Sequence, residues 1–344
     1  MSRLLRPDSA VVLAAWCVAS LAACEDGAAP PSFECERRAV GSPLPGPVLV
    51  PPGSNIFGNY KPYGSSGTGF VATFTRGLVV MAHEVTRGDW LEFVETDPTR
   101  VCGAPCSAQF PVDSVRWTDS LWYANQRSLA DGLVPCYDLA GCHGKPGTTL
   151  VCDDYQGLAF ELTCEGWRLP TVLEWEYMAR AGDKKPSPCY TTDPNYGGWT
   201  NWEPCLHQVA WVGSTGRQGT QAVATLCPNR WGIYDAIGNV LEYSWDGDPL
   251  RELLNTTPRT EFVDAVYPSF ERGPLALGAS VLQDENYAHY GYGEGAGPIA
   301  PPFDDVITEG PVTPSPYVGF RLVRTAKAAD YVSRGLDVPD NALP

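Results

Sequence analysis

Cysteine content is the feature that most constrains the fold of this chain. The sequence has 12 cysteines, ten of them between positions 35 and 227, and none follows position 227. An even number of cysteines in an exported chain predicts disulfide bonds. Zinc is the competing interpretation, but it needs paired C-x2-C or H-x3-H spacings, and the four histidines are widely scattered. Ten cysteines remain when Cys17 and Cys24, near the N-terminus, are set aside. We therefore expect at most five disulfides, with their pairing left open. The ten cysteines are Cys35, Cys102, Cys106, Cys136, Cys142, Cys152, Cys164, Cys189, Cys205 and Cys227.

The first 23 residues predict export. Arg3 and Arg6 precede an apolar stretch, residues 10–23, that is too short to span a bilayer as a mature helix. The stretch ends in LAAC, which resembles the lipobox of bacterial lipoproteins, where the cysteine is acylated and becomes the new N-terminus. Cys24 is then the lipid anchor; the alternative is an ordinary secretory signal with Cys24 left free. Either interpretation predicts export, and the anchored one predicts a location in the cell envelope, at the outer membrane or on a periplasmic or extracellular face.

The charge balance limits the partners of the chain. With 24 basic and 40 acidic residues, its net charge is −16. Nucleic-acid binding requires a concentrated positive surface, so we exclude nucleic acid as a partner. No apolar run after the signal reaches the length of a membrane span, so we expect membrane contact through the lipid anchor only.

Composition along the chain predicts one large domain between two flexible segments. Residues 24–47 are rich in Pro, Gly and Ala and are typical of a tether, and residues 327–344 lose aromatic side chains and are typical of a loose tail. The domain is expected over residues 48–326. Its many Gly, Pro, Trp and Tyr residues favour long loops pinned by aromatic side chains and disulfides over long regular elements.

A few local elements are nevertheless clear. Capping residues and apolar spacing predict helices over residues 87–95, over residues 118–129, and after Thr171, whose partner in a capping box is Glu174. Gly182 is the expected stop of that third helix. Apolar and β-branched runs predict strands over residues 77–81 and 318–323.

The loop of residues 235–242 combines two acids with a glycine. Asp235 and Glu242, together with backbone carbonyls between them, could supply the oxygen shell that calcium prefers. The alternative is a turn whose carboxylates cap backbone amides.

Four segments, in this order, resemble the formylglycine-generating enzyme family, also called sulfatase-modifying factors. They are EVTRGDWLEF at 84–93, GWRLPTVLEWEYMARAG at 166–182, RWGIYDAIGNVLEYSWD at 230–246 and VGFRLVR at 318–324. The resemblance covers residues 48–326 and implies an irregular α+β fold, related to the C-type lectin fold, with little regular secondary structure and disulfide bracing. It also implies calcium, held by the side chains of Asp235 and Glu242 and the carbonyls of Gly238 and Val240.

The residues that carry the family's chemistry are missing. Members of the family oxidise a cysteine of a sulfatase to formylglycine with two cysteines that bind copper(I). The resemblance places Gln283 and Ala288 at these two positions. An amide and a methyl group cannot replace two thiolates. We therefore expect neither a copper site nor formylglycine generation by the family's known route.

Two oxidoreductase alternatives stay open. A displaced metal site could use Cys102 and Cys106, although a local disulfide explains this close pair more simply. A related branch of the family uses a three-histidine iron site, but His83, His143, His207 and His289 share no ligand spacing. A structural role in an envelope complex is a third possibility.

The prediction we favour is a non-oxidase that binds a ligand in the former active-site groove. The segment after the lost cysteine position is polar and aromatic, which suits stacking and hydrogen bonding with a peptide, protein or glycan. The alternative is that these aromatic side chains only pack loops. The groove residues are Ser280, Gln283, Asn286, Tyr287, His289 and Tyr290.

Overall fold

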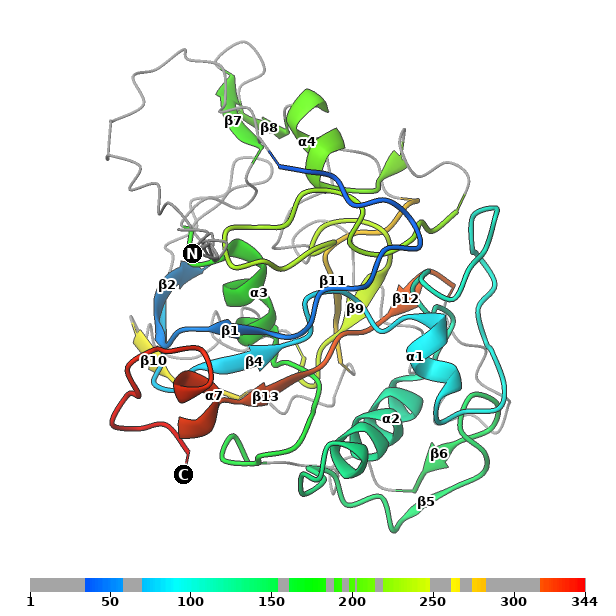
Figure 1. Cartoon of the computed structure of the whole chain (residues 1–344), viewed down its shortest axis with the longest axis horizontal. Helices are drawn as coiled ribbons and strands as arrows, with labels where there is room; N and C mark the ends of the chain where they lie inside the picture. The colour runs from blue at the N-terminus through cyan, green and yellow to red at the C-terminus, as the bar shows by residue number, and fades with distance from the viewer. Residues whose placement is uncertain are drawn as a thin grey trace, which may run out of the picture. The chain divides into compact units, whose positions relative to one another are not determined.

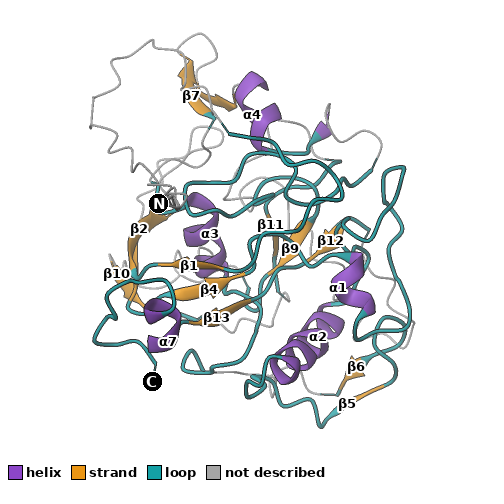
Figure 2. Cartoon of the chain, in the orientation of Figure 1, coloured by secondary structure: helices purple, strands orange, loops and turns teal. Residues whose placement is uncertain are grey.

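A computed structural model describes most of the chain from residue 35 onward. The described ranges are residues 35–57, 70–153, 161–183, 189–193, 198–201, 203–213, 219–247, 261–266, 274–282 and 316–343. Figure 2 shows short helices and strands joined by long loops, as the glycine and proline content predicts. The expected irregular α+β fold is thereby confirmed. None of the described helices has the length and apolarity to cross a membrane.

Three small sheets organise the domain (Figure 1). In the first, β4 (Leu78–Val80) lies between β1 (Val48–Val50) and β13 (Val323–Thr325), antiparallel to both. Val80 pairs with Val48 on one side and with Val323 on the other. This sheet therefore joins the beginning and the end of the domain.

Aromatic side chains pack along one face of the second sheet. In it β3 (Phe70–Phe74) is antiparallel to β2 (Gly53–Phe57) and parallel to β10 (Glu261–Val263). Alternate residues of β3 are buried, and Phe70 stacks on Phe57 and meets Phe262 edge-on. The period of two along β3 thus gives one continuous aromatic face.

The third sheet carries the region of the predicted site. In it β9 (Leu241–Tyr243) lies between β11 (Ala276–Leu277), which is antiparallel to it, and β12 (Val318–Gly319), which is parallel. The predicted strand over residues 318–323 is therefore divided. Its two ends, β12 and β13, belong to different sheets, and the buried residues 320–322 connect them.

The three predicted helices are present. Helix α1 (Arg87–Leu91) begins after a Thr86–Asp89 capping box, but it is shorter than predicted. Helix α2 (Trp117–Ala130) begins one residue earlier than expected. Helix α3 (Val172–Arg180) has the predicted Thr171–Glu174 capping box and ends where Ala181 and Gly182 adopt positive φ.

Two short helices and two hairpins complete the described elements. Helix α4 (Glu203–Val209) and helix α7 (Ala328–Val332) were not predicted. The hairpins pair β5 (Cys142–His143) with β6 (Val151–Cys152), and β7 (Tyr190–Asp193) with β8 (Gly198–Asn201).

Five disulfides connect these parts, the largest number that the ten described cysteines allow. The longest, Cys35–Cys227, joins residues 192 positions apart, whereas Cys102–Cys106 spans four. The remaining three are Cys136–Cys164, Cys142–Cys152 and Cys189–Cys205.

The structured region extends beyond residues 48–326 at both ends. Residues 35–47, expected as tether, are held by the Cys35–Cys227 disulfide and by Arg38, whose guanidinium donates to the carbonyl of Ala224 (3.1 Å). At the other end, expected as a loose tail, Tyr331 of α7 is buried and Asp330 is paired with Arg324. A covalent link and an apolar anchor thus order segments whose composition alone is typical of flexible chain.

Candidate functional site

The predicted groove lies largely outside the described residues. Of its members only Ser280 is described. The others, together with the two lost-cysteine positions and the proposed lipidation site, fall in ranges that the structure does not describe: Cys24, Gln283, Asn286, Tyr287, Ala288, His289 and Tyr290.

The segment that leads into the groove, residues 278–282, is well defined. Gly278 has a φ of +98°, and a Cβ there would lie 2.8 Å from the ring of Trp175, so both space and backbone require glycine. Ser280 is buried, and its hydroxyl oxygen accepts the N–H of Leu282 (3.3 Å). Leu282 is 62% exposed, so the chain reaches the surface at this leucine.

Asn239 fixes this segment to the rest of the domain. Its carbonyl accepts the N–H of Val281 (3.1 Å), and its side-chain oxygen accepts the N–H of Gln221 (2.8 Å). Its side-chain amide donates to Oε2 of Glu84 (2.9 Å). Asn239 is completely buried at a φ of 62°, a conformation that asparagine tolerates better than most residues. Hydrogen bonds to a buried side chain therefore hold residues 278–282 against the rest of the domain.

Glu84 is a completely buried acid beneath Asn239. Its other oxygen, Oε1, accepts the N–H of Val240 (3.2 Å). Burial raises the pKa of Glu84 well above its usual value, and the nearby carboxylates of Asp235 and Glu242 raise it further, against the partial opposition of Arg321.

Arg321 supplies the positive charge among these acids. Its Nε and Nη2 donate to the two carboxylate oxygens of Glu242 at 2.6 and 2.5 Å, and Nη2 also donates to the carbonyl of Tyr234 (2.9 Å). The indole N–H of Trp175 donates to Oε2 of Glu242 (2.8 Å). The ion pair is fully buried, with exposures of 0% and 1%. Both oxygens of Glu242 are thus used within the protein.

These contacts do not fit the calcium shell that the resemblance implies. Glu242 already has its charge balanced by Arg321, which occupies both of its carboxylate oxygens. Asp235 accepts the N–H of Ala224 (2.6 Å), and burial raises its pKa to about 6. Asp235 thus caps a backbone amide, as the alternative interpretation expects, and Glu242 forms an ion pair. Calcium therefore stays a prediction without support from this geometry.

Two members of this buried cluster, Glu84 and Arg321, were not predicted as site residues. A signal for them exists in the sequence, because Arg321 stands inside the apolar run GFRLV and Glu84 lies near the end of the mostly apolar run LVVMAHEV. A buried charge requires a partner of opposite sign or a set of hydrogen bonds. Which charges meet cannot be read from the runs themselves.

A small cavity lies elsewhere, at the start of α3. Arg168 lines it with Glu174, and its guanidinium nitrogens donate to the two carboxylate oxygens of Glu174 (2.7 Å each). The cavity has a volume of about 20 Å³, which admits a water molecule and not a substrate. Among the described residues, no group of three or more His, Cys, Asp or Glu is arranged to hold a metal ion.

Comparison with known families gives one match over most of the chain. The family described as "Sulfatase-modifying factor enzyme 1-like domain" matches residues 32–326. The match begins close to Cys35, in agreement with the order seen in residues 35–47.

Individual relatives and one solved structure are also similar to this chain. The chaperone protein LppX of Paenibacillus barcinonensis is 29% identical over 172 residues, which are 48% of this chain and 60% of LppX. The formylglycine-generating enzyme of Mus musculus is 36% identical over 86 residues, 24% of this chain and 23% of that enzyme. The chain thus spans less than two thirds of either relative. The structure of Treponema denticola variable protein 1 aligns with a TM-score of 0.60 at 22% identity, covering 84% of this chain and 98% of that one.

Proposed function

Because the chain belongs to the sulfatase-modifying factor enzyme 1-like family, we propose that it is an exported, lipid-anchored member that binds polypeptides and lacks the copper-dependent oxidase activity. The ligand occupies the groove that begins at Ser280 and Leu282. Cys24 carries the lipid.

The proposed loss of oxidase activity rests on the pairing of the cysteines. All ten cysteines from Cys35 to Cys227 are joined in five disulfides. Positions 283 and 288 hold Gln and Ala, and no cysteine follows Cys227. Copper(I) requires soft ligands such as thiolates, and the domain offers no pair of free thiols.

The same disulfides support export, and the short connection from Cys24 to the first of them supports a position near the membrane. Structural disulfides persist in oxidising compartments, such as the bacterial cell envelope. Only ten residues separate Cys24 from Cys35, where the covalently fixed domain begins. Fully extended, this connection reaches at most about 40 Å. A lipid on Cys24 would therefore keep the domain close to the membrane surface.

Two observations favour a polypeptide over a glycan as the ligand. One relative is named as a chaperone protein. Just before the predicted groove residues, Leu282 exposes a large apolar side chain directly after a segment held by hydrogen bonds. An exposed leucine on a fixed backbone suits an apolar segment of an unfolded chain, because burying such a side chain is favourable.

The purified mature protein is expected to form no aldehyde on a cysteine peptide that the mouse formylglycine-generating enzyme oxidises, in the presence of copper(I) and dioxygen. The reason is the absence of two free thiolates. Mass spectrometry of the peptide measures the product, with the mouse enzyme as the positive control. A Q283C/A288C variant is expected to gain copper(I) retention of about one equivalent per chain. Aldehyde formation by the unaltered protein would contradict the proposal.

The variant L282D is expected to bind an unfolded reporter polypeptide, carboxymethylated α-lactalbumin, at least about tenfold more weakly than the unaltered protein. The expectation follows because burial of a leucine side chain contributes about 1.5–3 kcal/mol, and 1.4 kcal/mol is a tenfold change in affinity. Fluorescence anisotropy measures the affinity. The matched control is L336D, since Leu336 is also half-exposed, at 49%, but lies near the C-terminus. Equal affinities for both variants, or binding only to a glycan array, would refute a polypeptide groove at Leu282.

A further inference from the structure

We propose that the Cys102–Cys106 disulfide is a thiol–disulfide exchange site, in which Cys106 forms a mixed disulfide with a thiol of a partner and Arg87 stabilises its thiolate. This function is separate from ligand binding in the groove.

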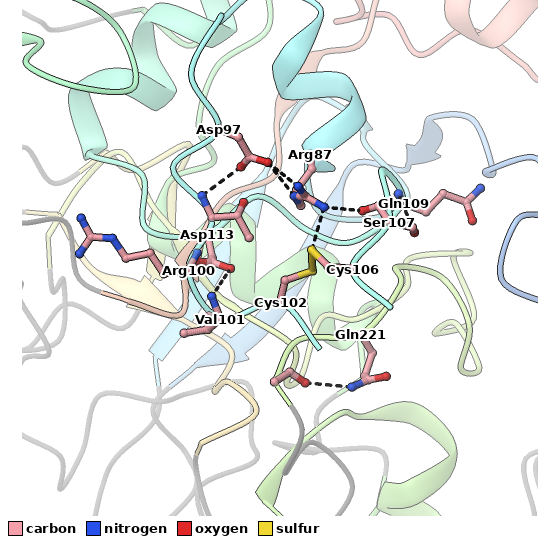
Figure 3. The surroundings of a disulfide bond; sticks show 12 residues. Arg87, Asp97, Arg100, Val101, Cys102, Cys106, Ser107, Gln109, Asp113 and Gln221 are labelled. Atoms are coloured by element: carbon pink, nitrogen blue, oxygen red, sulfur yellow. Dashed lines mark hydrogen bonds and ion pairs between the residues drawn. A yellow bond between two sulfur atoms is a disulfide. The ribbon is translucent and has the colours of Figure 1, made fainter. Parts of the chain in front are cut away.

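Arg87 contacts this disulfide through its guanidinium group (Figure 3). Its Nη1 donates to Sγ of Cys106 (2.7 Å) and to the carbonyl of Ser107 (3.1 Å), while Nε and Nη2 donate to Oδ2 of Asp97 (2.8 and 2.6 Å). Burial raises the pKa of Asp97, but the hydrogen bonds from Arg87 and Thr99 outweigh burial, so the pKa lies below its usual value and Asp97 stays charged. Asp97 thus holds the guanidinium in place with one N–H directed at the sulfur. A cation at this distance favours a thiolate over a thiol.

Exposure selects Cys106 as the reacting cysteine. Of the ten cysteines in disulfides, Cys106 is the only exposed one; Cys102 and the others are half-buried or buried. Attack by an external thiolate requires access to the sulfur, and exposure favours Cys106 over the half-buried Cys102.

The other cysteine, Cys102, is held by the fold. The N–H of Gly103 donates to the carbonyl of Thr220, and the N–H of Thr220 donates to the carbonyl of Val101 (2.9 Å each). The carboxylate of Asp113 accepts the N–H of Arg100 (2.9 Å), just before this bridge. A fixed partner cysteine beside an exposed one is the arrangement of a resolving and an attacking thiol.

A purely structural role does not explain these features. Stabilisation by a disulfide grows with the length of the loop that it closes, and Cys102–Cys106 closes the shortest of the five, with a separation of four residues against 10, 16, 28 and 192. It therefore restricts the unfolded chain least.

The exchange is balanced without any further reactant. A partner thiolate attacks Sγ of Cys106, the bond between Cys102 and Cys106 breaks, and the electron pair leaves on Cys102, which takes a proton from solvent. A second partner thiolate attacks the partner's sulfur in the mixed disulfide, and Cys106 leaves as the thiolate that Arg87 stabilises. Two partner thiols are oxidised to a disulfide while the protein disulfide is reduced to a dithiol. A disulfide-bearing partner reverses both steps.

The test uses the full mature chain in glutathione redox buffers, with alkylation of free thiols and mass spectrometry. We expect Cys102–Cys106 to open at a reduced-glutathione concentration at least tenfold lower than Cys142–Cys152 does. We also expect C102S to trap glutathione on Cys106 at least tenfold faster than C106S traps it on Cys102. Opening of Cys142–Cys152 first, or faster trapping on Cys102, would overturn the proposal.

Variants of Arg87 separate stabilisation of the thiolate from support of the fold. In the C102S background, R87Q is expected to slow trapping about tenfold and R87K to restore part of the rate, with thermal melting used to select folded protein. The matched control is R100Q, because the Arg100 side chain points away from the disulfide in Figure 3. An unchanged rate in folded R87Q, or an equal loss in R100Q, would overturn the role of Arg87.

Discussion

Replacing Arg321 with methionine is expected to lower the free energy of unfolding by about 3–5 kcal/mol, a large part of the stability of a typical domain. Arg321 is completely buried, pairs with both oxygens of Glu242, and lies near the buried acids Glu84 and Asp235. Its removal leaves these acids without their cation in a medium that penalises unpaired charge. Urea unfolding followed by tryptophan fluorescence measures the change.

The matched control for this prediction is R127M. Arg127 pairs with Asp131 at 2.8 Å, but both side chains are 31% exposed, so the loss is expected to stay below about 1 kcal/mol. The double variant R321M/E242Q is expected to recover part of the stability, since it removes the unpaired charge of Glu242. Similar losses in R321M and R127M would show that the buried cluster does not stabilise the domain.

Removing the Cys35–Cys227 disulfide, in the double variant C35S/C227S, is expected to lower the free energy of unfolding by about 4–5 kcal/mol. The bond closes a loop between residues 192 positions apart, and the entropy lost by the unfolded chain increases with the logarithm of that length. The variant is also expected to become sensitive to proteolysis in residues 35–47. Urea unfolding and limited digestion followed by mass spectrometry measure the two effects.

The comparison for the long disulfide is C142S/C152S. This bond spans a separation of ten residues, and the same dependence on loop length gives about 3 kcal/mol. If the two double variants lost equal stability, and residues 35–47 stayed protected in C35S/C227S, the N-terminal segment would not depend on its disulfide.

Several local elements follow directly from neighbouring residues. The capping boxes at Thr86 and Thr171 and the end of α3 near Gly182 are where the sequence predicts them. Each depends on side chains within about one helical turn, so short-range chemistry is sufficient. The ordered set of motifs likewise predicted the family that the comparison over residues 32–326 supports.

The ordered ends of the domain could not be predicted in the same way. Residues 35–47 have the composition of a tether, yet Cys35 binds Cys227 far away in the chain. Helix α7 lies in a segment that loses aromatic side chains apart from Tyr331, and that tyrosine is buried. Composition averages over a segment, whereas one disulfide or one buried ring is enough to order it.

The difference between neighbouring residues and contacts across the chain also applies to the candidate site. The placement of Gln283 and Ala288 at the family's cysteine positions stays a prediction, because it rests on the ordered motifs and both residues lie outside the described ranges. The sequence was not sufficient to predict that Glu242 faces Arg321, that Glu84 lies beneath Asn239, or that Arg87 donates to the sulfur of Cys106. Those contacts join positions up to 155 residues apart. Only the folded chain brings such groups within hydrogen-bonding distance, and burial then decides how strongly their charges interact.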